Sequence, residues 1–257
     1  MKTTIKFEDY EALVSNIIKC FRQECYEILR SHKEFTEKYD KMFSIEARPS
    51  ALIFVEDEIL SQNKKGKDGK RMGWKEPMFS KKDIINTYNK EIYERQNTPA
   101  KAYCSYTFDD EGKAVIKELR IQLNYDFLNA AVLTNLYRIT EYYDVVIKSW
   151  AQHECGHILD YIISFDGLSK KVIDKEENEI IKARKAYSKW WKDNRDKNGN
   201  LTPELETQRL KMYFEIPCEA KADMLGGVDR EKVIAYTLKD RDRRVVTVMK
   251  SKTVKRK

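Results

Sequence analysis

The sequence predicts an α+β fold that is mainly helical and carries a small mixed sheet. Two long segments, Phe7 to Leu29 and Glu141 to Phe165, repeat apolar residues every three or four positions, as helices with one buried face do. A third segment, Leu119 to Asn124, alternates apolar and polar residues, which is typical of a strand with one face in solvent. The length of 257 residues fits one domain, or a core with an added lobe.

The composition indicates a chain that buries a core beneath a heavily charged surface. Apolar residues make up 41% and charged residues 35%, which excludes wholesale disorder. No apolar run approaches the roughly 18 residues that span a bilayer, and the first residues lack the apolar stretch of a secretion signal. The five cysteines have no CxxC spacing, so we expect reduced thiols. We therefore expect a soluble, cytoplasmic protein without a membrane partner.

The formal net charge of +7 is partly concentrated in two places. One is the run Lys64 to Arg71, within a loop near 62–75, and the other is the run Lys250 to Lys257, at the end of a basic C-terminal tail that covers 241–257. Such runs can contact nucleic acid or another polyanion, but a solvated loop and a frayed end explain them more often. We expect at most a weak polyanion contact there.

The first region, 1–100, is expected to be helical around the amphipathic segment that begins at Phe7. After the break at Arg48-Pro49-Ser50, the apolar, β-prone run 51–55 predicts a short strand. Ser80 is placed to cap a further helix that continues to Ile92.

The second region, 101–240, is expected to form the core that carries the chemistry. It begins with a hairpin, 103–108 and 119–124, with a turn at 109–112. The long helix from Glu141 stops at Asp166-Gly167, and a charged helix near 168–200 then protrudes as an insertion. Three further helices are predicted from their starting residues: Thr202-Pro203-Glu204, Pro217 and Asp229, the last running to Leu238.

The segment His153-Glu154-Cys155-Gly156-His157 is the strongest functional signal in the sequence. Because residues four apart share one face of a helix, both imidazoles can reach one metal ion, with Glu154 beside the open coordination position. With three histidines in the chain and Glu at about one position in ten, the expected number of chance HExxH matches is roughly 0.004. We therefore expect a Zn²⁺ site in which Glu154 is the general base and acid.

A catalytic zinc site needs a third protein ligand. The remaining histidine, His32, lies on the far N-terminal helix, so a carboxylate or thiolate is expected. Glu219 and Asp223 share one face of the helix opened by Pro217; Glu219 would complete a His2Glu set, and Asp223 would accept the ring N–H of a zinc-bound histidine.

Two rivals for the third ligand remain. Glu215 precedes Pro217, and so a helix break would separate it from the site. Cys218 is out of phase with the acidic pair at 219 and 223.

Smaller features give weaker expectations. Either Tyr213 or Tyr161 could stabilise the oxyanion of a tetrahedral intermediate, although ordinary packing is the more frequent role of such a residue. Gly156 inside a helix costs about 1 kcal/mol against Ala, so we expect a close backbone approach, to the neighbouring strand. Cys155 is expected to be a small packing residue rather than a nucleophile.

The two motifs together, HExxH at 153–157 and ExxxD at 219–223, resemble the pattern of gluzincin-type zinc metallopeptidases. The Gly before the second His and the Glu-x-x-Ala-Asp form of the second motif are similar to small intracellular members of the ImmA/IrrE type. The resemblance covers roughly Gly112 to Gly227. Glu219 comes 62 positions after His157, further than in compact members, and no helix-turn-helix is attached.

This resemblance implies a zincin-like fold, zinc, peptide-bond hydrolysis and the ligand roles given above. It also implies a strand beside the active-site helix, at whose edge an extended substrate binds, and the segment 119–124 is expected in that role. The sequence therefore favours a zinc metallopeptidase acting on a peptide or protein. The alternatives are a non-catalytic zincin-like protein that binds nucleic acid or a protein through its basic loop and tail, and a zinc-binding zincin fold that hydrolyses nothing.

Overall fold

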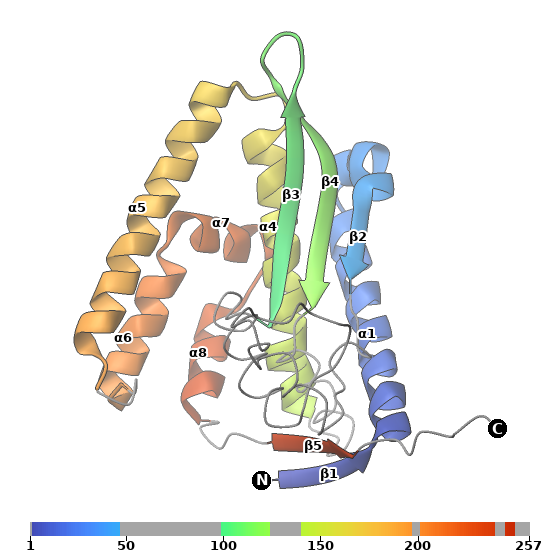
Figure 1. Ribbon diagram of the computed structural model, residues 1–257, viewed down its shortest axis with the longest axis vertical. Coiled ribbons are helices and arrows are strands. Elements are labelled where there is room, and N and C mark those ends of the chain that lie inside the picture. The colour runs from blue at the N-terminus through green and yellow to red at the C-terminus, as the bar shows by residue number, and fades with distance from the viewer. Residues whose placement is uncertain (1, 47–98, 124–139, 197–200, 240–244, 250–257) are drawn as a thin grey trace, which may run out of the picture.

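The structure is a computed structural model of the chain, and it describes residues 2–46, 99–123, 140–196, 201–239 and 245–249. The strand expected at 51–55, the basic loop at 62–75, the helix from Ser80 and the end of the tail lie outside the described residues. Within the described part, the mainly helical α+β architecture with a small mixed sheet is confirmed (Figure 1). None of the described helices is both long and apolar enough to cross a membrane.

The two long helices form where the apolar periodicity predicts them. Helix α1 (Phe7–Arg30) buries most of its described apolar stripe, including Val14, Phe21 and Leu29. The segment from Glu141 begins with one wide turn, η6 (Tyr142–Ile147), and continues as α4 (Lys148–Phe165). Helix α4 ends just before Gly167, whose positive φ of 74° suits a residue without Cβ.

The main sheet has three strands, β2 (Phe43–Glu46), β3 (Ala100–Phe108) and β4 (Ala114–Leu123), in the order β2-β4-β3. Strands β3 and β4 form the predicted antiparallel hairpin, and β2 pairs with β4 in parallel. Strand β4 is therefore central, and the expectation that residues 119–124 form the edge beside the site is wrong. The reason is β2, which covers the other side of β4; among the described strands, the edge facing α4 is β3.

The core lies between this sheet and the helices α1 and α4, which pack against one face of it (Figure 1). One continuous apolar cluster joins α1, the short turn η1 (Phe35–Tyr39), the three strands, Ile147 of η6 and α4. The turn η2 (Asp40–Met42) connects η1 to β2 and buries no residue. The cluster contains residues from both sides of position 100. A second, two-stranded sheet pairs β1 (Lys2–Lys6) with β5 (Val245–Met249) in parallel, so the first part of the region 241–257, which was expected only as a basic tail, contains a strand.

The C-terminal helices begin and end close to their predicted positions. They are α5 (Lys170–Asn194), α6 (Pro203–Phe214), α7 (Pro217–Gly226) and α8 (Arg230–Lys239). The Thr202 hydroxyl accepts a hydrogen bond from the Leu205 N–H at 3.4 Å and caps α6 as expected. Helix α5 has a single fully buried residue, Ile173, and stands beside α6 and α7 as a protruding element (Figure 1).

Candidate metal centre

The site depends on an unusually close contact between α4 and α7. A Cβ added at Gly156 would lie 1.8 Å from the carbonyl oxygen of Ala222, and one added at Gly226 would lie 1.9 Å from that of Gln152. Only glycine fits at these two points. The close approach expected at Gly156 is present, but its partner is helix α7 and not the neighbouring strand. This contact brings the face of α7 that carries Glu219 onto the HExxH face of α4.

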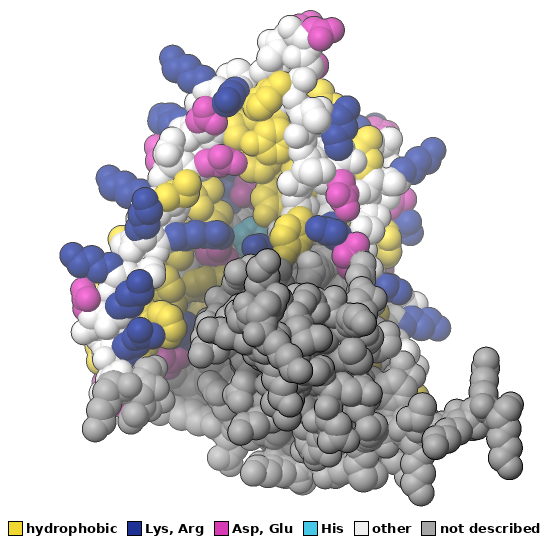
Figure 2. Space-filling model, viewed as in Figure 1, with side chains coloured by type: hydrophobic (Ala, Val, Ile, Leu, Met, Phe, Trp, Pro, Cys, Tyr) yellow, Lys and Arg dark blue, Asp and Glu magenta, His cyan; other side chains and the backbone are white. Residues whose placement is uncertain are grey.

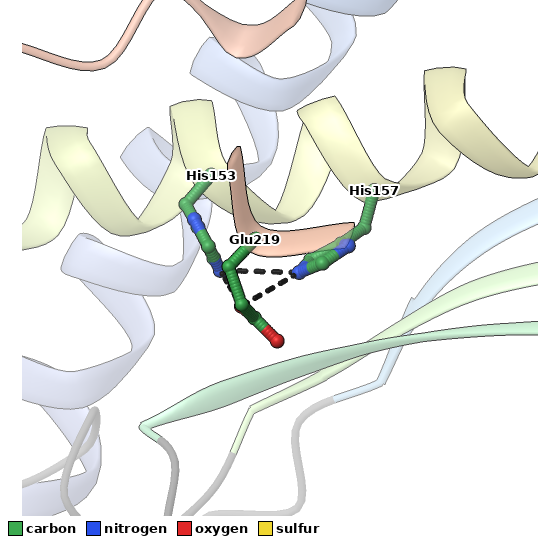
Figure 3. Close-up of side chains that lie close together, drawn as sticks. All are labelled: His153, His157 and Glu219. Carbon is green, nitrogen blue, oxygen red and sulfur yellow. Dashed lines mark hydrogen bonds and ion pairs between the residues drawn. The ribbon is translucent and has the colours of Figure 1, made fainter. Parts of the chain in front are cut away.

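Three side chains converge between the two helices. The Nε2 atoms of His153 and His157 lie 3.1 Å apart, and Glu219 Oε2 lies 3.2 Å from the first and 3.4 Å from the second. Figure 3 shows the two rings projecting from α4 toward the carboxylate that enters from α7. Ligands bound about 2.0 to 2.2 Å from a tetrahedral ion lie about 3.3 to 3.6 Å apart. The three observed distances, 3.1 to 3.4 Å, lie within about 0.2 Å of this range, so the three atoms are spaced nearly as three corners of a zinc tetrahedron.

A chain of hydrogen bonds orients His153. Its Nδ1 lies 2.6 Å from Asp223 Oδ1, and Arg230 donates from Nε to Asp223 Oδ2 at 2.8 Å. Donation from Nδ1–H leaves the Nε2 lone pair free for a metal. Burial disfavours the charged ring, but the hydrogen bonds with Asp223 and Glu219 outweigh this effect and raise the pKa of His153 in the metal-free protein.

Glu219 is held by contacts with both of its oxygens. Oε2, the oxygen near the histidines, accepts a hydrogen bond from the Tyr213 hydroxyl at 2.8 Å, and Oε1 accepts one from Arg184 Nη2 at 2.9 Å. Burial would raise the pKa of this carboxyl group, but the hydrogen bonds with His153 and His157 hold it well below its usual range. Glu219 is therefore a carboxylate at neutral pH, which is the form that ligates a cation.

Glu154 lies buried beside the converging side chains. Its carboxyl group interacts with the backbone of Ala102 on β3, and its Oε2 atom has no hydrogen-bond partner among the described residues. Burial raises the pKa of Glu154, and the positive charge available on His153 and His157 opposes the rise. A buried carboxylate oxygen without a partner is costly in a structural role and is common where a group must accept a proton.

Edge strand β3 and Tyr161 form the wall of the site. The Tyr161 hydroxyl donates to the Ala102 carbonyl at 3.3 Å, and its ring stacks on His157 with centroids 6.3 Å apart. Figure 2 shows a hollow between α5 and the sheet, with a histidine side chain at its floor and Lys and Arg side chains around it. The histidine side chains are 16% and 12% exposed, so the site can be reached from solvent.

The remaining sequence candidates lie elsewhere. His32 is exposed at the end of α1, and Glu215 is exposed at the end of α6. Cys218 Sγ lies 3.5 Å from Glu219 Oε1 but outside the group that could hold a metal, which in the described part of the chain consists of His153, His157 and Glu219. Cys155 is buried against α1, with its Sγ atom 3.7 Å from the Cys25 carbonyl, as expected of a packing residue.

Three contributors to the site were not among the residues predicted from the sequence. Ala102 acts through its backbone, so its side chain gives no signal. Arg184 lies 35 positions before the Glu219 that it contacts, on a helix in which charged residues are frequent. Arg230 could have been found, because it follows Asp223 by seven positions at the start of the next helix.

In comparisons with known proteins, no family model, no curated protein and no solved structure matches the chain.

Proposed function

We propose that this protein is a zinc-dependent metallopeptidase with a zincin-like fold. The observation that carries the proposal is the spacing of His153 Nε2, His157 Nε2 and Glu219 Oε2, which fits three corners of a tetrahedron. The described residues offer three ligands and no fourth, and catalytic zinc sites keep one position open in this way. Glu154, whose Oε2 atom has no hydrogen-bond partner among the described residues, interacts electrostatically with all three of these side chains.

The residues of the chain suit hydrolysis of a peptide bond. Zinc, when bound, would supply Lewis-acid chemistry and acidify a water molecule. Glu154 accepts the proton of the attacking water and passes it to the leaving amine, and the raised pKa of its buried carboxyl group makes it a stronger base than an exposed glutamate. Tyr213, whose hydroxyl donates to the ligand oxygen of Glu219 at 2.8 Å, is the residue that we expect to stabilise the developing oxyanion.

Substitution of Glu154 by Gln tests the proposal directly. The variant is expected to keep about one zinc per chain and to lose hydrolysis by a factor of about 10² to 10⁴, the usual contribution of a general base. Zinc content is measured by mass spectrometry of the metal, and hydrolysis with a library of quenched fluorescent peptides. Glu219→Ala is the matched variant that should lose both zinc and activity. A Glu154→Gln protein that cleaves as fast as the parent would contradict the mechanism.

The alternative, a non-catalytic binding protein with a structural zinc, requires a closed set of four ligands. The described residues supply three, so no observation favours it. Binding of a hydroxamate to the zinc-loaded protein would support an open site, since a hydroxamate needs free coordination positions.

A cytoplasmic location belongs to the same proposal. All five cysteines are described, and all five are free thiols. Reduced thiols are the usual state in the cytosol.

A further inference from the structure

Arg184 reaches the metal centre from α5, the helix inserted between the HExxH helix and the helix of Glu219. Its Nη2 group lies 2.9 Å from Glu219 Oε1 and 3.4 Å from Cys218 Sγ. Oε1 is the carboxylate oxygen that does not lie against the two histidines. The guanidinium group is therefore at the rim of the centre and leaves the ligand positions free.

Some N–H donors of the Arg184 guanidinium group have no acceptor within the described residues. The Arg184 side chain is 56% exposed, and within the described residues its Nε and Nη1 groups have no hydrogen-bond acceptor. The donors that remain, Nε–H and the two Nη1–H groups, lie on different edges of the guanidinium group, and each can give a charge-assisted hydrogen bond to a carboxylate oxygen. Arg184 can thus hold Glu219 with Nη2 and offer Nε or Nη1 to a ligand in the hollow between α5 and β3 (Figure 2).

The charges around the centre favour an anionic ligand. The positive charge of Arg230 is matched by Asp223, with which it forms an ion pair. A dication held by Glu219 and two neutral histidines, together with Arg184, outweighs the remaining negative charge, that of Glu154. The occupied centre would be net positive, and a carboxylate near Arg184 would complement it.

We propose that Arg184 is a specificity residue that selects peptides with a carboxylate next to the scissile bond. This inference rests on the proposed function. The carboxylate could be the C-terminus of the peptide or the side chain of an Asp or Glu, and both offer the same pair of oxygens to the guanidinium group.

The test measures binding in the zinc-loaded Glu154→Gln protein, so that no peptide is consumed. Fluorescent peptides of one core sequence would differ in a single group: a free C-terminus against a C-terminal amide, and an internal Glu against Gln. We expect a Kd about 10 to 100 times lower for the carboxylate member of at least one pair, as for a hydrogen-bonded charged group. The pair that shows the preference identifies the source of the carboxylate.

Adding Arg184→Met should bring the ratio of the two Kd values close to one. The matched control is Lys185→Met, which removes the same charge from the neighbouring exposed position on α5 and should leave the ratio unchanged. Equal affinity within both pairs, a preference that survives Arg184→Met, or an equal loss in Lys185→Met would overturn this inference alone. Failure of the parent protein to take up zinc would instead overturn the proposed function.

Discussion

The two ring nitrogens of His153 have different roles, and the contact with Asp223 assigns them: Nδ1 donates a hydrogen bond and Nε2 is the ligand atom. The 2.6 Å contact with Asp223 fixes Nδ1 as a donor, and this leaves Nε2 to face His157 and Glu219. In the metal-free protein the same acidic neighbours raise the pKa of the ring. A proton and a metal ion therefore compete for Nε2 of His153.

This competition gives a prediction about pH. Because the pKa of His153 is raised from its usual value of about 6.5 to about 10, both ring nitrogens still carry a proton at pH 8, and zinc must displace the proton on Nε2. Zinc binding at pH 8 should release about one proton from this ring, and affinity should continue to rise with pH above 7. Asp223→Asn should lower the pKa, reduce the proton release at pH 8 and weaken zinc binding by about 10- to 100-fold.

Calorimetry in two buffers of different ionisation enthalpy measures the proton release. Glu215→Gln is the matched control, because it removes an exposed carboxylate four positions before Glu219. Equal proton release in the parent and in Asp223→Asn would show that Asp223 does not set the protonation of His153.

At the scale of the elements, the site is made by the packing of α4 on α7. Gly156 and Gly226 each allow the backbone of the partner helix to approach, and no larger residue fits at either position. The separation of the two motifs along the chain is therefore of little consequence, since the helices meet face to face.

Gly156→Ala tests this packing, because the expected change in the free energy of unfolding is opposite in sign to the change that helix propensity predicts. Helix propensity alone would make the change stabilising by about 1 kcal/mol. The new Cβ would instead collide with the Ala222 carbonyl, so we expect a loss of about 1 to 3 kcal/mol in the free energy of unfolding and weaker zinc binding. Urea denaturation and zinc titration provide the measurements. Ile163→Ala, an exposed change on the same helix, should stay within about 0.5 kcal/mol of the parent; a stabilised Gly156→Ala protein would refute the close contact.

The helices of the site could be predicted from the sequence because their signals are local. Apolar periodicity defined α1 and α4, and capping residues and prolines defined the starts of α6 and α7. The strand order could not be predicted, because it depends on β2, a four-residue strand that pairs with β4 from far along the chain. Strand β5 is rich in β-branched residues, which favour a strand, but it lies in a basic segment that was expected only as a tail.

For the candidate site, the spacing of His153, His157, Glu219 and Asp223 was sufficient to identify residues that meet in space. The role of Arg184 could not be predicted, since its contact with Glu219 depends on how α5 packs against α6 and α7. Contacts of this kind follow from the packing of whole helices and leave no trace in a local pattern.

At the scale of the whole molecule, two parts of the fold supply the residues of the candidate metal centre. The sheet with α1 and α4 supplies a packed body, two histidines and Glu154, and the helices α5 to α8 supply Glu219, Asp223, Arg184 and Arg230 (Figure 1). Pairing of β1 with β5 joins the first and last described segments. The centre is therefore complete only when both parts are folded against each other.

X-ray absorption spectroscopy of the zinc-loaded protein tests whether His153, His157 and Glu219 hold the metal. This ligand set predicts one zinc per chain with four N or O ligands at about 2.0 to 2.2 Å, including two imidazoles and no sulfur. Glu219→Ala should lower the occupancy, and Glu154→Gln should leave the spectrum unchanged. A zinc–sulfur distance of about 2.3 Å, a single imidazole, or no uptake of zinc would contradict it.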